Sequence, residues 1–220
     1  MNNFQRVSVW SQWIRLAHWS IALSVLVLMA TGWLVTSAPS LAAGAGDLHG
    51  YAASVLMAGL ALRIWLLFAD RGVGGWEALV PSGTDLPAMK QMLMFYFTLG
   101  RSPLPAWYGH NPLWVPLYAL LYLFLLVMAF SGLFMQEHPL FAGIYLPSIH
   151  RAFAGIISGV ALFHVLTVVL QDIRGKRGDV SAMLNGYKLF DTERQELAGP
   201  GRQSPAVSID NIRRDRKDDR

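Results

Sequence analysis

Four long apolar stretches decide what this chain can fold into. They cover residues 14–36, 48–69, 112–135 and 147–171. Each is long enough for a helix that crosses a bilayer, which takes about 20 apolar residues. Inside lipid the backbone polar groups have to be satisfied within such a segment, and a helix does this. The sequence therefore predicts an all-α fold, an integral membrane four-helix bundle.

The rest of the chain is too short for a second large domain. Hydrophobic residues make up 54% of the sequence and charged residues only 15%, against about 25% charged residues in soluble domains. The segment after the fourth stretch is rich in Gly, Pro, Ser and charges, and such a composition does not bury enough apolar surface to fold alone. We expect a transmembrane domain over residues 1–172 and a polar cytoplasmic tail over 173–220, largely disordered or ordered by a partner.

One further helix is expected between the second and third stretches. Residues 85–100 have a polar start, a proline near the beginning, an apolar body and a glycine at the end. The segment is too short to span a bilayer. It is typical of an interfacial helix on the cytoplasmic surface; a loop partly buried against the bundle is the alternative.

The basic residues indicate the orientation in the membrane. The chain has 18 Lys and Arg and a formal net charge of +4. Arg151 alone lies on the side reached by the loops after the first and third stretches; the other basic residues outside the membrane follow the second and fourth stretches or precede the first. By the positive-inside rule we expect both termini to be cytoplasmic. No basic surface with interleaved aromatic residues points to nucleic acid.

Histidine is the main candidate for binding a metal. The chain has no cysteine, which excludes disulfides, thiolate-bound metals and iron–sulfur clusters within it. Of six histidines, two fall in loops, His110 and His138. The other four fall inside the predicted spans, where an ionisable side chain is costly and is a functional candidate by default: His18, His49, His150 and His164.

These four histidines pair by depth. His18 and His164 lie near the cytoplasmic ends of the first and fourth helices, whereas His49 and His150 stand at the outer starts of the second and fourth. His150 and His164 are 14 residues apart, which places them on nearly the same helix face with a rise of about 21 Å. Two stacked haems need this arrangement. Two axial histidines leave no open position on the iron, which suits electron transfer.

The four histidines have two other interpretations. A zinc site needs three or four ligands in one cluster, and the two pairs are separated by most of the bilayer. A helical scaffold or transporter without a cofactor leaves four membrane histidines unexplained. Both are weaker than haem ligation.

Three arginines lie at the same depths. Arg15 shares a helix face with His18, Arg151 follows His150, and Arg63 lies about two turns inside the second helix. Haem carries two propionates, so these arginines are candidates for binding them. For Arg15 and Arg151 the alternative is contact with lipid headgroups.

The motifs together resemble a known family. They are Arg15 to Trp19 (RLAHW), Thr31-Gly32, His49-Gly50, Arg63, Gly109 to Leu113 (GHNPL), His150, His164, Arg177-Gly178-Asp179 and Met183 to Lys188 (MLNGYK). Over residues 10–190 this pattern is similar to that of the membrane cytochrome b subunits of nickel–iron hydrogenases and the gamma subunits of formate dehydrogenases.

The resemblance implies specific roles. In that family the histidines of the first and fourth helices bind the cytoplasmic-side haem b, and those of the second and fourth bind the outer haem b. Electrons come from an outer-face partner, such as a hydrogenase, another oxidoreductase or a cytochrome c, and pass to quinone near the inner haem. His110 and Asn111 would then lie near the quinone, with His164 at its edge. The alternative for Asn111-Pro112 is a structural turn.

Two functions from different classes follow. The first is a di-haem electron-transfer subunit that joins an outer-face redox partner to the quinone pool. The second is a free-standing membrane oxidoreductase that takes electrons from a small reductant such as superoxide and passes them to quinone.

Overall fold

The computed structural model describes residues 4–81, 83–175 and 178–191. Within these ranges the helices are α1 (Gln12–Ser37), α2 (Ala42–Ala69), α3 (Leu86–Phe97), α4 (Val115–Phe134), α5 (Leu146–Gly175) and α6 (Asp179–Asn185). The strands are β1 (Phe4–Ser8), β2 (Leu140–Phe141), β3 (Ile144–Tyr145) and β4 (Tyr187–Asp191). Short 3-10 turns occupy η1 (Pro39–Leu41), η2 (Trp76–Leu79) and η3 (Gly83–Asp85).

The four predicted spans are confirmed as helices. α1, α2 with the preceding turn, α4 and α5 are each long and apolar enough to cross a membrane. Most of their side chains face outward: Trp33 on α1 is 65% exposed and Phe68 on α2 is 77% exposed. Large apolar side chains on an outer surface are expected where lipid replaces water.

The predicted helix boundaries need two corrections. α2 begins at Ala42 rather than near residue 48, so that residues 42–47 of the predicted loop belong to the helix. His49 therefore lies about two turns inside α2 instead of at its start. α5 also runs past Gln171 to Gly175.

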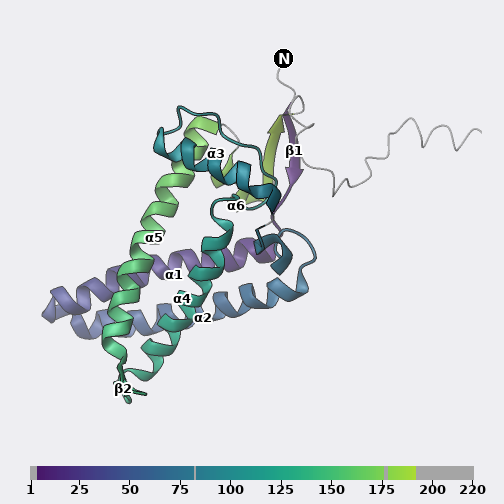
Figure 1. Cartoon of the computed structure of the whole chain (residues 1–220). Helices are drawn as coiled ribbons and strands as arrows, with labels where there is room; N and C mark the ends of the chain where they lie inside the picture. The colour runs from purple at the N-terminus through teal and green to yellow at the C-terminus, as the bar shows by residue number, and fades with distance from the viewer. Residues whose placement is uncertain (1–3, 82, 176–177, 192–220) are drawn as a thin grey trace, which may run out of the picture.

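The helices form two hairpins that cross. Figure 1 shows α1 and α2 lying side by side, with α4 and α5 running across them. α1 and α2 approach closely at Gly59, where a Cβ would lie 2.9 Å from Cβ of Ser20. Where the hairpins cross, a core forms from buried side chains of α2, α4 and α5: Leu56, Leu60, Leu125 and Ile157.

The bundle has two ends. The hairpin end carries the connections from α1 to α2 and from α4 to α5, the latter made by the small β2–β3 hairpin. The terminal end carries β1, α3, α6 and β4, as Figure 1 shows. Because β1 pairs with β4, both described ends of the chain lie on the same side of the bundle.

The predicted helix between the second and third spans is α3. Its side chains Met92 and Phe95 are fully buried, whereas Phe97 is 78% exposed. It therefore packs one face on the bundle and leaves the other open. The segment is a helix, so the alternative of a loop is wrong, although burial against the bundle is present on one face. Its position at a membrane surface stays a prediction.

Residues 178–191, at the start of the expected tail, are folded against the N-terminal strand. β4 pairs antiparallel with β1, and α6 lies between two glycines in the left-handed region, Gly178 (φ 67°) and Gly186 (φ 89°). Lys188 is 1% exposed and forms an ion pair of 2.8 Å with Asp179. We call residues 4–8 and 179–191 the terminal cap.

Composition alone does not predict the terminal cap, because its two strands come from opposite ends of the chain. Residues 192–220 of the expected tail lie outside the described residues.

Candidate functional site

The structure brings the four membrane histidines together as two pairs. The ring centres of His18 on α1 and His164 on α5 lie 6.3 Å apart. Those of His49 on α2 and His150 on α5 also lie 6.3 Å apart. These are the pairs expected from depth. We call them the terminal-end pair and the hairpin-end pair.

Both distances fit two imidazoles on opposite sides of one metal ion. A metal–imidazole bond of about 2.0 Å, with the ring centre about 1.1 Å beyond the nitrogen, places two opposed ring centres about 6.2 Å apart. Each pair could therefore hold one haem iron, which would supply one-electron exchange there.

The hairpin-end pair is held by hydroxyl groups. Thr31 Oγ1 lies 2.9 Å from His49 Nδ1, and Ser131 Oγ lies 3.0 Å from His150 Nδ1. Both hydroxyl residues are buried. With Nδ1 engaged, Nε2 is the nitrogen left to bind a metal. The sequence motif included Thr31 without assigning it a role, and it did not include Ser131. The Thr-Gly pair at residues 31–32 recurs as Ser-Gly at residues 131–132, and this repeat could have identified Ser131.

The terminal-end pair is surrounded by tryptophans. The indole of Trp19 contacts the His18 ring edge-on and donates a hydrogen bond of 2.9 Å to the carbonyl of Met183 in α6. The Trp114 ring contacts His164, with 5.2 Å between centres. This pair is thus enclosed by the terminal cap and by the start of α4.

Space remains along α5 between its two histidines. A Cβ built on Gly155 or Gly159 would meet no atom within 4 Å. These glycines therefore do not serve close helix packing in the described part of the chain. The open face on α5 leaves room for a flat macrocycle between the levels of His150 and His164.

Arg63 is a buried cation with an unused donor. Its Nε donates to the Tyr122 hydroxyl at 3.1 Å and its Nη1 to the Gly74 carbonyl at 2.8 Å. Its Nη2 is buried without a hydrogen-bond partner. A guanidinium in this state favours an anionic partner, and a carboxylate such as a propionate has the matching geometry.

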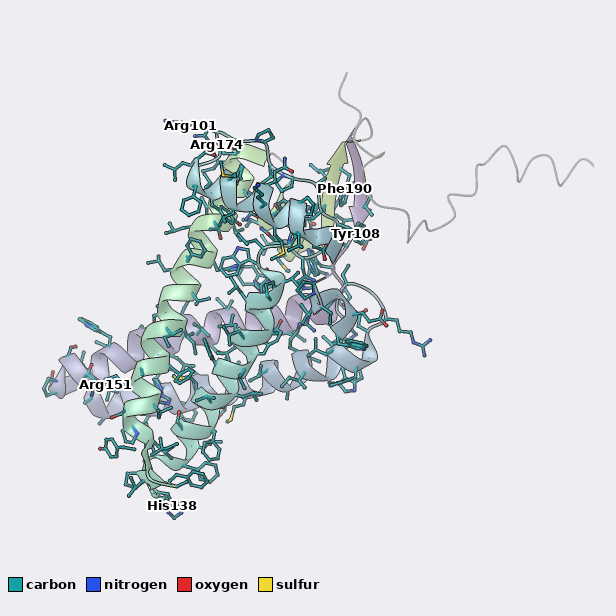
Figure 2. The ribbon with its side chains drawn as sticks, in the orientation of Figure 1. Arg101, Tyr108, His138, Arg151, Arg174 and Phe190 are labelled. Carbon is teal, nitrogen blue, oxygen red and sulfur yellow. The ribbon has the colours of Figure 1, made fainter. Side chains whose placement is uncertain are left out.

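The other two arginines differ from each other. Arg15 is half-buried, donates from Nη1 to the Leu184 carbonyl and keeps its Nε buried without a partner. Arg151 is exposed on the surface of α5 near the hairpin end, as Figure 2 shows. Arg15 thus has a donor free for a propionate, whereas the exposed position of Arg151 equally suits a lipid headgroup.

The two candidate quinone residues have different surroundings. Asn111 is buried; its Oδ1 accepts from the Leu113 amide at 3.0 Å, which forms the turn before α4. His110 lies edge-on between the rings of Trp10 and Tyr118, and its Nδ1 is buried without a hydrogen-bond partner. Burial, with the nearby charge of Arg63 as a second cause, lowers the pKa of His110 to about 4. The His110 ring is therefore neutral at neutral pH.

Tyr96 on α3 joins this region to α5. Its hydroxyl accepts hydrogen bonds from Asn111 Nδ2 at 3.0 Å, from Trp114 Nε1 at 3.2 Å and from Gln171 Nε2. Burial raises the pKa of Tyr96, so the phenol stays protonated. Distant pairing of this kind leaves no signal in the sequence.

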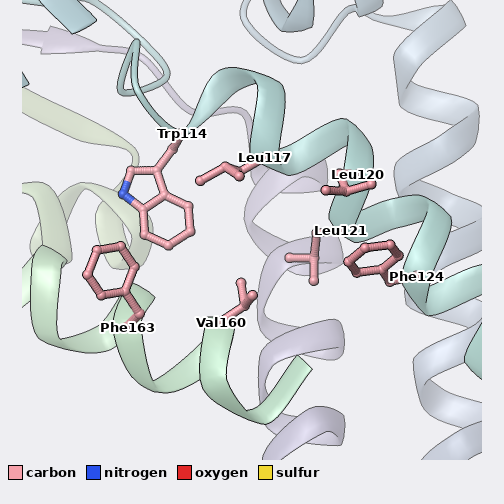
Figure 3. A pocket seen from close by; sticks show the side chains of 7 residues that line it. All are labelled: Trp114, Leu117, Leu120, Leu121, Phe124, Val160 and Phe163. Atoms are coloured by element: carbon pink, nitrogen blue, oxygen red, sulfur yellow. The ribbon is translucent and has the colours of Figure 1, made fainter. Parts of the chain in front are cut away.

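An apolar pocket lies beside His164, between α4 and α5. Figure 3 shows Trp114 and Phe163 at one end and the aliphatic side chains of α4 along one wall. Its lining consists of Trp114, Leu117, Leu120, Leu121, Phe124, Val160 and Phe163. Such a lining suits an apolar ring or tail.

A zinc cluster receives no support from the geometry. Within residues 4–81, 83–175 and 178–191, no group of three or more histidine or acidic side chains could hold a metal ion. Zinc takes at least three protein ligands. Two ligands per level suit a metal whose other ligands come from a macrocycle.

Comparisons with known proteins identify the family. The family described as prokaryotic cytochrome b561 matches residues 9–186. A protein of Rhizobium leguminosarum bv. viciae named "Probable Ni/Fe-hydrogenase B-type cytochrome subunit" is 28% identical over 84% of this chain and 90% of its own. Proteins with the same name from Cupriavidus necator and Bradyrhizobium diazoefficiens are 27% and 25% identical, over 80% and 84% of this chain and 84% and 86% of their own. No solved structure matches the chain significantly.

The family match covers all four spans and both histidine pairs. The chain therefore belongs to the prokaryotic cytochrome b561 family, a family of membrane cytochromes b.

Proposed function

We propose that this chain is the di-haem b subunit that carries electrons across the bacterial inner membrane, from a redox partner at the hairpin end to the quinone pool. Membership of a cytochrome b family makes it a haem b electron-transfer protein. The observation that carries the further step is the geometry of the histidines: two pairs, each with 6.3 Å between ring centres, at two levels of one bundle.

The proposal assigns a pair of histidines to each haem. His18 and His164 hold one haem iron at the terminal end, and His49 and His150 hold the other at the hairpin end. The rise between the two ligands on α5 is about 21 Å. When bound, each haem supplies reversible one-electron exchange, and two axial imidazoles keep other ligands from the iron.

Arginines are assigned to orient the haem carboxylates. Arg63 and Arg15 each keep a buried N–H without a partner, and a propionate would complete the hydrogen bonding of either side chain. Arg151, being exposed, is assigned the same role at the hairpin end, with a headgroup contact as its alternative.

The terminal end faces the cytoplasm in this proposal. Arg101 and Arg174 both lie there, as Figure 2 shows, and the described residues of the hairpin connections contain no Lys or Arg. The hairpin end with His49 and His150 then faces the outer compartment, where the partner docks.

The partner is proposed to be a nickel–iron hydrogenase. The three relatives carry that association in their names and align over most of their length. Quinone is proposed to bind near the terminal end, where the apolar pocket at Trp114 adjoins His164 and the neutral His110 lies nearby.

The test follows electrons from donor to quinone. Membranes of the native host are given hydrogen without oxygen, and the b-haem absorbance and the redox state of the quinone are measured. Hydrogen should reduce haem and quinone in normal membranes. In membranes that lack this chain or carry His49→Ala, it should not reduce the quinone.

Two outcomes contradict the proposal. If hydrogen leaves the haem oxidised and superoxide reduces it, the free-standing oxidoreductase replaces the hydrogenase subunit. If quinone reduction is unaffected by loss of the chain, the chain is not the route to quinone.

A further inference from the structure

The ligands of the hairpin-end pair are supported by two matching sets of residues. His49 on α2 meets Thr31 on α1, and His150 on α5 meets Ser131 on α4. Each histidine thus lies on the second helix of a hairpin and its hydroxyl partner on the first. The described residues form no hydrogen bond to the rings of His18 and His164, so this support is specific to one level.

On the first hairpin the direction of the hydrogen bond can be assigned. The Thr31 hydroxyl donates to the carbonyl of Val27 at 2.7 Å. Its oxygen is then an acceptor toward His49 Nδ1, at 2.9 Å. An acceptor that faces Nδ1 requires that Nδ1 carries the proton.

The second hairpin repeats this arrangement at the equivalent positions. The Ser131 hydroxyl donates to the carbonyl of Met128 at 3.2 Å and faces His150 Nδ1 at 3.0 Å. The Nδ1 atom of each ring therefore faces a hydroxyl that donates its own proton to a backbone carbonyl of its helix.

A glycine follows each hydroxyl residue and lies against the ring. A Cβ at Gly132 would lie 3.1 Å from His150 Cε1, which is tighter than an ordinary contact, whereas a Cβ at Gly32 would lie 3.6 Å from His49 Cε1, an ordinary van der Waals distance. The missing side chain at Gly132 therefore lets the His150 ring approach α4 closely beside Ser131.

We propose that Thr31 and Ser131 are positioning residues that hold His49 and His150 as Nδ1–H imidazoles and selectively lower the midpoint potential of the haem between them. This inference rests on the proposed function, because it takes the hairpin-end pair as axial ligands. An imidazole that donates its second N–H is a more basic ligand. A more basic ligand favours the oxidised iron, which lowers the potential.

The test is a redox titration of the purified holoprotein that resolves both haems. The His49→Ala variant identifies which component belongs to the hairpin end. Thr31→Val and Ser131→Ala remove one acceptor each and should raise the potential of that haem while the other stays unchanged. The expected change in the ratio of oxidised to reduced haem is about threefold to tenfold per hydroxyl, as for one neutral hydrogen bond; tenfold corresponds to about 59 mV for one electron.

Conservative variants distinguish a positioning role of the two hydroxyl groups from general damage to the fold. Thr31→Ser and Ser131→Thr keep a hydroxyl and should restore the potential toward that of the unaltered protein. Thr36→Val is the matched control, because the Thr36 hydroxyl bonds only to backbone carbonyls of α1. The second readout is the low-spin EPR spectrum, whose g-values should change for the hairpin-end haem alone.

The outcomes are distinguishable from failure of the proposed function. If two haems are present and neither Thr31→Val nor Ser131→Ala moves the hairpin-end potential, the positioning role is wrong and the di-haem assignment stands. Equal shifts of both haems would also overturn it. If the unaltered protein lacks the hairpin-end haem, the proposed function itself fails.

Discussion

At the scale of single residues, the buried polar groups near the terminal end form a network around Tyr96. Three donors from the loop before α4, from its N-cap and from α5 meet at one phenol oxygen. Asn111 and Gln171 are themselves buried. The network fixes α3 against the bundle next to His164, so its loss is expected to affect stability first.

Tyr96→Phe should destabilise the protein clearly. The substitution removes an acceptor from three donors, and leaving a buried polar group unpaired costs about 1–3 kcal/mol. A loss of at least about 2 kcal/mol is expected, measured as a lower thermal midpoint in detergent. Tyr108→Phe is the control, since Tyr108 is 52% exposed and makes one long hydrogen bond of 3.4 Å. Equal midpoints for the two variants would show that the network does not stabilise the fold.

His110 should make stability depend on pH. Its pKa is about 4 in the folded protein against 6.5 ordinarily, mainly because of burial. Between these values the unfolded chain binds a proton that the folded chain does not, so stability falls as the pH drops through this window. His110→Phe removes this contribution, so its thermal midpoint should fall less than that of the unaltered protein between about pH 7 and about pH 4.5. His138→Phe is the loop control and should keep the original slope; an unchanged slope in His110→Phe would contradict the assignment.

The sequence predicted these residues unevenly. The four histidines were found because an ionisable group inside an apolar span is conspicuous. Ser131 and Tyr96 were missed because a hydroxyl in a helix or an aromatic residue in a surface helix has ordinary structural uses. Only the fold shows which histidine or amide they meet.

At the scale of elements, the terminal cap holds the start of α1. Val9 and Trp10 both donate from their amides to the carbonyl of Gly186, at 2.9 and 3.1 Å. Trp19 reaches Met183 beside His18. The cap therefore braces the helix that carries one ligand of the terminal-end pair.

Truncation after residue 177 should weaken the binding of the terminal-end haem. It removes α6 and β4, so that β1 loses its partner strand and Trp19 loses its acceptor. We expect a lower thermal midpoint and loss of the haem at His18, with the hairpin-end haem retained, measured by haem content and redox titration. Truncation after residue 191 is the control and should keep both haems, since the described cap contacts all lie before residue 192. Retention of both haems by the shorter chain would contradict a role for the cap.

At the scale of the whole molecule, hydropathy predicted the four spans but not how they cross. In lipid the outward faces are as apolar as the core, so the pattern does not say which face of a helix meets another. The paired histidines supplied that information for α1, α2 and α5. The crossing of the two hairpins and the close contact at Gly59 come from the structure alone.

The central claim is that each pair of histidines holds one haem. The most direct measurement is the haem content per chain, with the reduced-minus-oxidised spectrum, of the purified protein and of single alanine variants of His18, His49, His150 and His164. The prediction is two low-spin b-type haems in the unaltered protein and one in every variant. The haem that is lost from His18→Ala and the haem that is lost from His164→Ala should have the same midpoint potential. The haems that are lost from His49→Ala and His150→Ala should share the other midpoint potential. A single haem in the unaltered protein, or a single substitution that removes both haems or neither, would contradict it.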